Sequence, residues 1–313
     1  MEPMRLIFAG TPEVALPALS ALIDAGHDIA LVLTQPDAKG RRGSGLHPSP
    51  VKSFALDHGL AVETPAQASA PDVVERIRAL KVDAAGVVAY GQILRPPLIA
   101  ATAHGWVNLH FSVLPAWRGA APVQRALQAG DDMTGATTFL IEQGLDTGPV
   151  IGQLTETIKP TDTAGDLLDR LAKVGAKLLL DSLDALVNGT ARPQAQLADG
   201  VSHAPKLTRD DALVRWELPA HLVDRMVRAC TPAPGAWTTL PDGTSAKLGP
   251  VTPVDGPTTT PGLVKFLDGD VLVGTGGDPV RLSWIQPAGK KALDAREWWR
   301  GARWADGAQL GEA

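Results

Sequence analysis

Arg5-Leu-Ile-Phe-Ala-Gly10 is an apolar run followed directly by Thr11-Pro12-Glu13, and these two stretches decide the fold. The second stretch suits an N-cap, a proline at the first helical position and an acid in the first turn, so it predicts a helix over residues 14–25. Another apolar run follows over residues 29–33. A strand, a helix and a second strand in this order predict a βαβ unit and therefore an α/β protein with an N-terminal Rossmann-like parallel sheet.

The turn after the first strand and the spacing of the histidines bear on cofactors. Dinucleotide-binding proteins carry a G-x-G-x-x-G sequence in that turn, whereas Gly10 stands alone in Ala-Gly-Thr-Pro. His104 and His110 lack the spacing of metal ligands. We therefore predict that the protein binds neither NAD nor a metal.

The chain changes character after residue 189. Residues 190–206 lack apolar periodicity and contain prolines and glycines, which predicts a linker. A predicted helix and several short strand-like runs follow, and they predict a C-terminal β-barrel of the oligonucleotide-binding type. The runs are residues 236–240, 245–248, 262–266, 271–273 and 280–285. We therefore predict one domain over residues 1–189 and another over residues 207–313.

Composition indicates an ordinary folded protein. Of 313 residues, 44% are hydrophobic and 20% are charged, and no apolar run approaches the roughly 20 residues of a membrane span. The N-terminus lacks the pattern of a signal peptide, and the single cysteine, Cys230, excludes an internal disulfide framework. We expect a cytoplasmic protein with no membrane partner and with Cys230 packed in the core, and we expect it to be a monomer.

Charge is spread unevenly along the chain. The net charge of −5 argues against non-specific nucleic-acid binding by the protein as a whole. Residues 1–205 hold 16 Lys and Arg against 21 Asp and Glu, whereas residues 206–313 hold 13 of each kind. The second part is therefore neutral, which leaves room for a basic face there.

Residues 106–115, Trp-Val-Asn-Leu-His-Phe-Ser-Val-Leu-Pro, are predicted to carry the chemistry. Alternate residues of a strand share a face, so Asn108, His110 and Ser112 are expected to point the same way. Polar side chains on a buried strand lack water partners unless they serve a site, and this strand ends in a loop at Pro115, where α/β enzymes build active sites. The alternative is a hydrogen-bonded polar pair in the core without chemistry.

Two loops supply further charged side chains. Residues 34–50 are predicted to form a glycine-rich loop whose Lys39, Arg41 and Arg42 are able to grip phosphates. The alternative for this segment is a solvated surface loop. Asp146 lies between two predicted strands, where its alternative role is that of a turn-forming aspartate.

Seven short stretches occur here in a distinctive combination. They are Phe-Ala-Gly-Thr-Pro (8–12), Thr-Gln-Pro-Asp (34–37), Pro-Ser-Pro-Val-Lys (48–52), Val-Val-Ala-Tyr-Gly (87–91), Trp-Arg-Gly-Ala-Ala-Pro (117–122), Gly-Leu-Asp-Thr-Gly (144–148) and Ile-Gln-Pro-Ala-Gly-Lys-Lys (285–291). With them the chain resembles the methionyl-tRNA formyltransferase family from about residue 5 to residue 300. The Asn-x-His pair with a distant Asp is common to many formyltransferases that use 10-formyltetrahydrofolate. The stretches at 117–122 and 285–291 are much more specific to the one family.

The resemblance implies a reaction and the residues that perform it. A formyl group passes from the co-substrate 10-formyltetrahydrofolate to the amino group of initiator methionyl-tRNA, so tetrahydrofolate and tRNA are the expected partners. The implied catalytic residues are Asn108, His110 and Asp146, with Asp146 orienting His110 and favouring its protonated form. The implied folate-binding residues are Tyr90, Gly91, Ser112, Val113, Leu114 and Pro115. The implied tRNA-binding residues are Lys39, Arg41, Arg42, Lys206, Lys290 and Lys291.

One departure from the family and two alternative functions stay open at this point. The family usually has Gly where this chain has Phe111, and we expect this change to alter packing more than chemistry. The nearest alternative function is formyl transfer to a sugar nucleotide or a purine precursor, against which the cations of the C-terminal domain argue. A non-catalytic RNA-binding protein is the second alternative, and it leaves Asn108, His110 and Asp146 unexplained.

Overall fold

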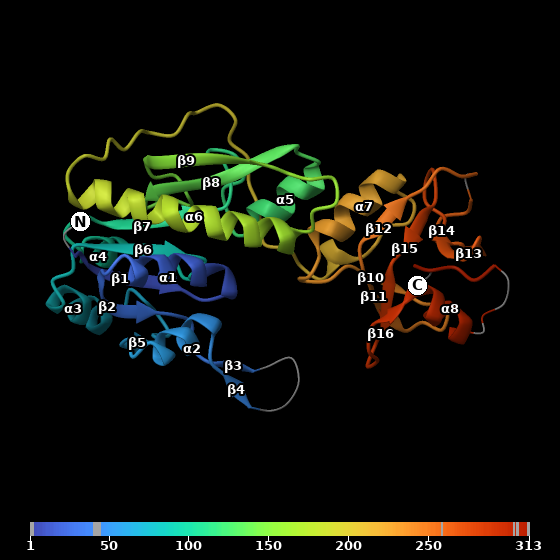
Figure 1. Ribbon diagram of the computed structural model, residues 1–313, viewed down its shortest axis with the longest axis horizontal. Coiled ribbons are helices and arrows are strands. Elements are labelled where there is room, and N and C mark those ends of the chain that lie inside the picture. Colours follow the sequence, from blue (N-terminus) through green and yellow to red (C-terminus); the bar gives the residue numbers. More distant parts are fainter. Residues whose placement is uncertain (1–2, 40–44, 258, 303, 305–306, 312–313) are drawn as a thin grey trace. The chain divides into compact units, whose positions relative to one another are not determined.

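The structure is a computed structural model that describes residues 3–39, 45–257, 259–302, 304 and 307–311. The chain forms two compact units (Figure 1). Unit 1 comprises Met1–Pro122, Met133–Thr157 and Leu168–Ala204, and unit 2 comprises Val123–Asp132, Ile158–Leu167 and Pro205–Ala313. Each unit is therefore assembled from separate stretches, whereas the sequence predicts domains that are continuous over 1–189 and 207–313.

Unit 1 contains a seven-stranded sheet in the order β5-β2-β1-β6-β7-β8-β9. The strands are β1 Arg5–Gly10, β2 Asp28–Leu33, β5 Val62–Glu63, β6 Ala84–Val88, β7 Trp106–His110, β8 Met133–Leu140 and β9 Val150–Thr157. The first five strands in the sheet order are parallel, which confirms the βαβ opening. β8 and β9 are antiparallel to their neighbours because the chain reverses direction after β7 and again after β8. The sheet is therefore mixed rather than purely parallel.

The helix predicted over residues 14–25 begins later in the structure, and further helices follow it along the chain. The helices in this part of the chain are α1 Leu16–Asp24, α2 Pro50–Asp57, α3 Pro71–Ala79, α4 Pro96–Ile99, α5 Pro122–Ala129 and α6 Ala164–Val187. α5 belongs to unit 2 apart from Pro122, and α6 belongs to unit 1 from Leu168 onward. A 3-10 turn, Glu13–Ala15, precedes α1, and Thr11 does not cap it. The Thr11 hydroxyl donates instead to the Tyr90 carbonyl at 2.8 Å, so tertiary contact overrides the local capping signal.

Helices cover both faces of this sheet. On one face, Ile7 of β1 belongs to a buried cluster that includes Ile77 of α3. On the opposite face, Gly86 of β6 lies so close to α6 that an added Cβ would be 3.3 Å from Leu179. The result is the helix-sheet-helix layering of an α/β domain.

The predicted loop over residues 34–50 contains a short hairpin of β3 Ala38–Lys39 and β4 Leu46–His47. Its base is fixed by an ion pair between Lys52 and Asp37 at 2.7 Å. Arg41 and Arg42 lie outside the described residues.

Unit 2 contains two four-stranded antiparallel sheets, in the orders β10-β11-β16-β17 and β12-β15-β14-β13. The strands are β10 Trp237–Thr239, β11 Ser245–Leu248, β12 Val251–Pro253, β13 Val264–Leu267, β14 Asp270–Val273, β15 Val280–Leu282, β16 Trp284–Pro287 and β17 Leu293–Asp294. The predicted single strand over 280–285 is wrong, because the chain leaves one sheet after Leu282 and enters the other at Trp284. Two further helices, α7 Ala220–Ala229 and α8 Ala295–Ala302, belong to unit 2 together with α5 from Val123 onward.

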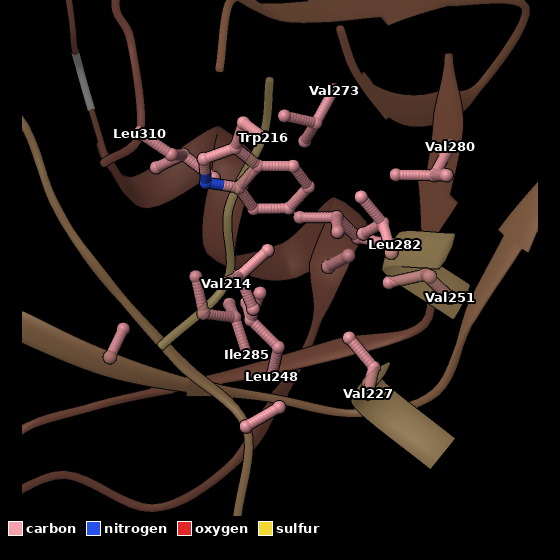
Figure 2. Packing of buried hydrophobic residues seen from close by; sticks show 14 of the residues in the cluster. Val214, Trp216, Val227, Leu248, Val251, Val273, Val280, Leu282, Ile285 and Leu310 are labelled. Atoms are coloured by element: carbon pink, nitrogen blue, oxygen red, sulfur yellow. The ribbon is translucent and has the colours of Figure 1, made fainter. Parts of the chain in front are cut away.

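The two sheets of unit 2 share one hydrophobic core, as the predicted barrel requires. Figure 2 shows the Trp216 ring among side chains from both sheets and from Leu310, and the indole N–H donates to the Thr238 hydroxyl at 3.0 Å. Cys230 lies in the same core, which confirms its predicted packing role, and burial raises the pKa of its thiol to about 11. Within the described part of the chain, no helix is both long enough and apolar enough to span a membrane.

Candidate active site

The site begins at the carboxyl end of β7, which holds Asn108 and His110. β7 pairs with β6 on one side and with β8 on the other, so the two residues lie in the interior of the sheet. They are two positions apart in one strand and therefore share a face, as predicted. The strand ends at His110, so Ser112 lies beyond it, where its hydroxyl donates to the Ala116 carbonyl at 2.6 Å. The prediction that Ser112 continues the strand face is therefore wrong, because the backbone turns before reaching it.

His110 and Asp146 lie together although 36 residues separate them in the chain. The Nδ1 atom of His110 is 3.7 Å from the Oδ2 atom of Asp146, and the two side chains are 6% and 17% exposed. On the other side of the ring, Nε2 of His110 donates to the Trp117 carbonyl at 2.9 Å. Since a carbonyl only accepts, a neutral His110 carries its proton on Nε2 and presents the Nδ1 lone pair toward Asp146.

The loop around Asp146 has an unusual backbone conformation. Asp146 has φ +54°, in the left-handed region, and Trp117, whose carbonyl holds His110, has φ +62°. Such conformations are strained for residues other than glycine and persist where the surroundings impose them. One of these constraints is the backbone N–H of Gly119, which donates to Oδ2 of Asp146 at 2.7 Å.

The protonation of His110 reflects two opposing influences. Burial lowers the pKa of His110, and this effect outweighs the nearby Asp146 carboxylate and the Trp117 hydrogen bond, which both raise it. Asp146 therefore favours the protonated form of His110, as predicted, but its effect on the pKa is smaller than that of burial. The lowered pKa favours the neutral form of His110, which suits it to accept a proton or to donate a hydrogen bond from Nε2.

Asn108 differs from its neighbours in having a free side chain. It is half-buried, and its amide makes no hydrogen bond to any other described residue. An amide carries two N–H donors and one acceptor, so Asn108 has donors available for a ligand at the end of β7.

The segment predicted to bind folate, residues 112–115, has its backbone fixed from the neighbouring strands. Thr137 of β8 donates to the Ser112 carbonyl at 2.7 Å and accepts from the Leu114 N–H at 3.1 Å. Gln153 of β9 donates to the Leu114 carbonyl at 2.8 Å. Leu114 is buried, whereas Val113 and Pro115 are half-buried. Thr137 and Gln153 were not predicted, and the available signal was limited to a polar residue, Thr137, within the buried strand β8.

Tyr90 and Gly91 follow β6, the strand beside β7. The Tyr90 ring is only 2% exposed within the core, and burial raises its pKa to about 12. The folate prediction for Tyr90 therefore concerns its backbone more than its ring. The Tyr90 carbonyl accepts hydrogen bonds from Thr11 and Gln35, and Gly91 adopts φ +86°, so the backbone makes a tight turn here.

The described residues predicted to bind tRNA are surface lysines. Lys39 is exposed on β3 in unit 1. Lys206, Lys290 and Lys291 are exposed in unit 2, and the last two follow β16. The structure thus brings together the predicted catalytic residues, while these lysines share only their exposure.

The predicted linker contributes side chains that no pattern in the sequence predicted. Gln196 donates from Nε2 to the carbonyls of Asp146 at 2.7 Å and Gly148 at 2.9 Å. Arg118 donates to Oε1 of Gln196 at 3.0 Å and 2.7 Å. The only sequence signal was the position of Arg118 in the stretch 117–122.

Comparison with known proteins defines the class of enzyme. Residues 4–183 match the formyl transferase family and residues 206–303 match the formyl transferase C-terminal domain. The fold resembles HypX from Aquifex aeolicus in complex with tetrahydrofolic acid, with a TM-score of 0.69 and 17% identity over 97% of this chain and 48% of that one. It also resembles the sugar 3N-formyl transferase WlaRD, with a TM-score of 0.66 and 19% identity over 93% of this chain and all of that one. The two family matches identify the chain as a formyl-transferring enzyme.

Curated relatives define the family more narrowly. Methionyl-tRNA formyltransferase from Salinispora arenicola is 56% identical over 96% of this chain and 97% of its own length. The same enzyme from Thermobifida fusca is 54% identical over 99% of this chain and 100% of its own. The chain belongs to the methionyl-tRNA formyltransferase family. This membership removes the alternative of a non-catalytic RNA-binding protein.

Proposed function

We propose that this protein transfers a formyl group from 10-formyltetrahydrofolate to the α-amino group of methionine on initiator tRNA. The observation that carries the proposal is the 56% identity to a methionyl-tRNA formyltransferase over nearly the full length of both chains. The buried His110–Asp146 pair beside the free Asn108 amide supports it, because these groups supply what an acyl transfer to an amine requires.

The reaction places charge on two atoms, and each has a candidate partner. The amine attacks the formyl carbon, a C–N bond forms, and negative charge develops on the formyl oxygen. The Asn108 amide and the Nε2–H of His110 are donors that can stabilise this oxygen. Access to the second donor requires the His110 bond to the Trp117 carbonyl to be exchanged for one to the substrate.

The proton balance involves His110 and Asp146. The attacking amine becomes cationic and must lose a proton, which the Asp146 carboxylate accepts directly or which the Nδ1 atom of a neutral His110 accepts. The intermediate then collapses, the bond from the formyl carbon to N10 of the folate breaks, and N10 takes up a proton. An amine nucleophile needs no covalent enzyme intermediate.

The substrate is tested by competition between amines. Labelled 10-formyltetrahydrofolate is incubated with the enzyme and with initiator methionyl-tRNA, an amino sugar nucleotide or a glycinamide-type purine precursor. We expect label in the tRNA alone. Transfer to either small amine at a rate equal to that of the tRNA would replace the proposed substrate with that amine.

We further propose that the lysines bind the tRNA by charge, with Lys39, Arg41 and Arg42 near the acceptor end. Lys206, Lys290 and Lys291 are exposed, and residues 206–313 hold 13 basic and 13 acidic side chains, which supports backbone contacts there. Replacing Arg41 and Arg42 together by Ala should weaken formylation of the charged tRNA. Unchanged kinetics in that double variant would leave the loop with no role in binding.

A further inference from the structure

Residues 194–204 form a strap, by which we mean a segment that hydrogen-bonds to both loops that hold the His110–Asp146 pair. At one end, Gln194 exchanges two backbone hydrogen bonds with Val150, at 2.7 Å and 2.8 Å, next to the Asp146 loop. At the other end, the Ser202 hydroxyl accepts from the Trp117 N–H at 2.8 Å, and Ala204 donates to the Arg118 carbonyl at 2.7 Å. All of these residues belong to unit 1, so the strap is part of the compact unit that contains the site.

Gln196 lies near the start of the strap, and both ends of its side-chain amide are hydrogen-bonded. Both of its described acceptors, the carbonyls of Asp146 and Gly148, lie on the Nε2 side, and the Arg118 guanidinium lies on the Oε1 side. Reversing the amide would place oxygen against two carbonyls and nitrogen against a cation. The partners therefore determine one orientation of Gln196.

Gln196 contacts the backbone of the one catalytic residue whose conformation is strained. Asp146 has φ +54°, and its carboxylate is held by the Gly119 N–H while its carbonyl is held by Gln196. Arg118, which clamps Gln196, is the residue before Gly119 in the chain. The two attachments of Asp146 are thus joined through Arg118, and loosening one is expected to shift the other.

We propose that Gln196, clamped by Arg118, is a positioning residue that holds the Asp146 carboxylate at His110. The inference rests on the formyl transfer proposed above and adds a residue to it. Gln196 touches neither His110 nor the Asp146 carboxylate, so it acts through the backbone of Asp146. Misplacement of a catalytic group by about 1 Å costs on the order of 10²-fold in rate, which makes the effect of such a hydrogen bond measurable.

The test compares Gln196→Glu with the control Gln194→Glu. Gln196→Glu keeps the acceptor for Arg118 but replaces the donor with an oxygen that repels both carbonyls. Gln194 lies two residues away in the strap, is exposed, and makes no side-chain hydrogen bond to another described residue, so its variant carries the same charge change without touching the Asp146 loop. Gln196→Ala, which removes the donor without adding charge, serves if the first variant does not fold.

Three quantities are measured for each variant: kcat with KM for both substrates, the thermal midpoint of unfolding, and hydrogen exchange of the Gly119 amide by NMR. For Gln196→Glu we expect kcat to fall about 10- to 100-fold while both KM values stay within about two-fold. Exchange of the Gly119 amide should become faster, because that N–H reports where the Asp146 carboxylate lies. Gln194→Glu should match the wild type in all three.

Two results would overturn the inference. One is a kcat for Gln196→Glu equal to that of Gln194→Glu. The other is a lower kcat that accompanies a lower unfolding midpoint with unchanged Gly119 exchange, which is the mark of a merely structural role. Gly119 exchange needs no substrate, so a failure of the proposed formyl transfer would be distinguishable from a failure of this positioning role.

Discussion

The surroundings of His110 in unit 1 and of Lys290 in unit 2 represent two ways of building a functional surface. His110 is 6% exposed, has a partner on each ring nitrogen, and is supported by a loop held in a strained conformation. Lys290 and its neighbour Lys291 are exposed and make no ion pair with any described residue. The first region works through fixed geometry, whereas the second is suited to work through summed charge.

This difference has consequences for how each region tolerates substitution. The position of His110 depends on a few individual contacts, so one replacement near His110 is expected to remove most of the activity. Charge interactions are additive and long-ranged, so each lysine is expected to contribute a small, salt-dependent share.

The largest effect is expected for His110→Ala. It removes the proposed donor to the formyl oxygen and the proposed proton acceptor, so kcat should fall by roughly 10²-fold or more. Folate binding should survive, because the backbone of residues 112–115 is held by Thr137 and Gln153 rather than by His110. Single-turnover formyl transfer and a folate titration measure the two properties. Near-normal turnover would remove His110 from the mechanism.

A smaller effect is expected for Gly119→Ala. Gly119 has φ +129°, and an added Cβ would lie 2.6 Å from the Ala204 carbonyl, so the strap has to shift. We expect kcat to fall about 10-fold and stability to fall by about 1–3 kcal/mol. Gly200→Ala is the control, since Gly200 has φ +80° in the same strap but no atom within 4 Å of an added Cβ. Equal kcat in the two variants would show that the clash does not reach Asp146.

A still smaller effect is expected when Lys290 and Lys291 are both replaced by Ala. The affinity for tRNA should weaken several-fold, and the slope of log K against log salt should decrease by about 0.7–0.9 for each tRNA phosphate that is no longer neutralised. The kcat at saturating tRNA should not change. Replacing Lys173 and Lys177 of α6 removes the same charge from unit 1 and provides the control. An identical salt slope in the two double variants would contradict a specific role for the lysines of unit 2.

The smallest effect concerns the titration of His110. Burial lowers its pKa, so an NMR titration should give a midpoint below the ordinary value of about 6.5. Because Asp146 raises this pKa, Asp146→Asn should move the midpoint further down. The unfolded chain takes up this proton at a higher pH than the native one, so the His110 contribution to stability decreases as the pH falls below about 6.5. A midpoint above 6.5 would mean that Asp146 outweighs burial.

The apolar patterns of the sequence predicted several strands correctly. The bounds of β1 and β11 agree with the predicted strands, and β7 carries Asn108 and His110 as expected. β12 and β17 were not predicted, and β17 contains only two residues, too few to show periodicity. The switch between sheets after Leu282 was missed because the apolar alternation continues through it.

The site was predictable in its residues but not in its supports. Asn108 and His110 are polar residues on a predicted buried strand, and Asp146 lies in a loop between two predicted strands. All three could therefore be singled out from the sequence alone. Gln196 could not, because its partner Asp146 lies 50 residues away and its own segment has no periodicity. The hydrogen bonds that hold the site join distant segments, and such bonds leave no local pattern.

The assembly of each unit from separate stretches restricts how these enzymes can exchange parts. Unit 2 includes residues 123–132 and 158–167, and Arg125 in the first of these stretches pairs with Asp211 at 3.5 Å. A chimera joined at residue 189 would combine a foreign strap with the native Asp146 loop and a native Arg125 with a foreign partner. A working exchange has to keep residues 194–204 with the recipient and bring residues 123–132 and 158–167 from the donor. We therefore expect the two halves of the chain to be exchangeable between enzymes only as a matched pair.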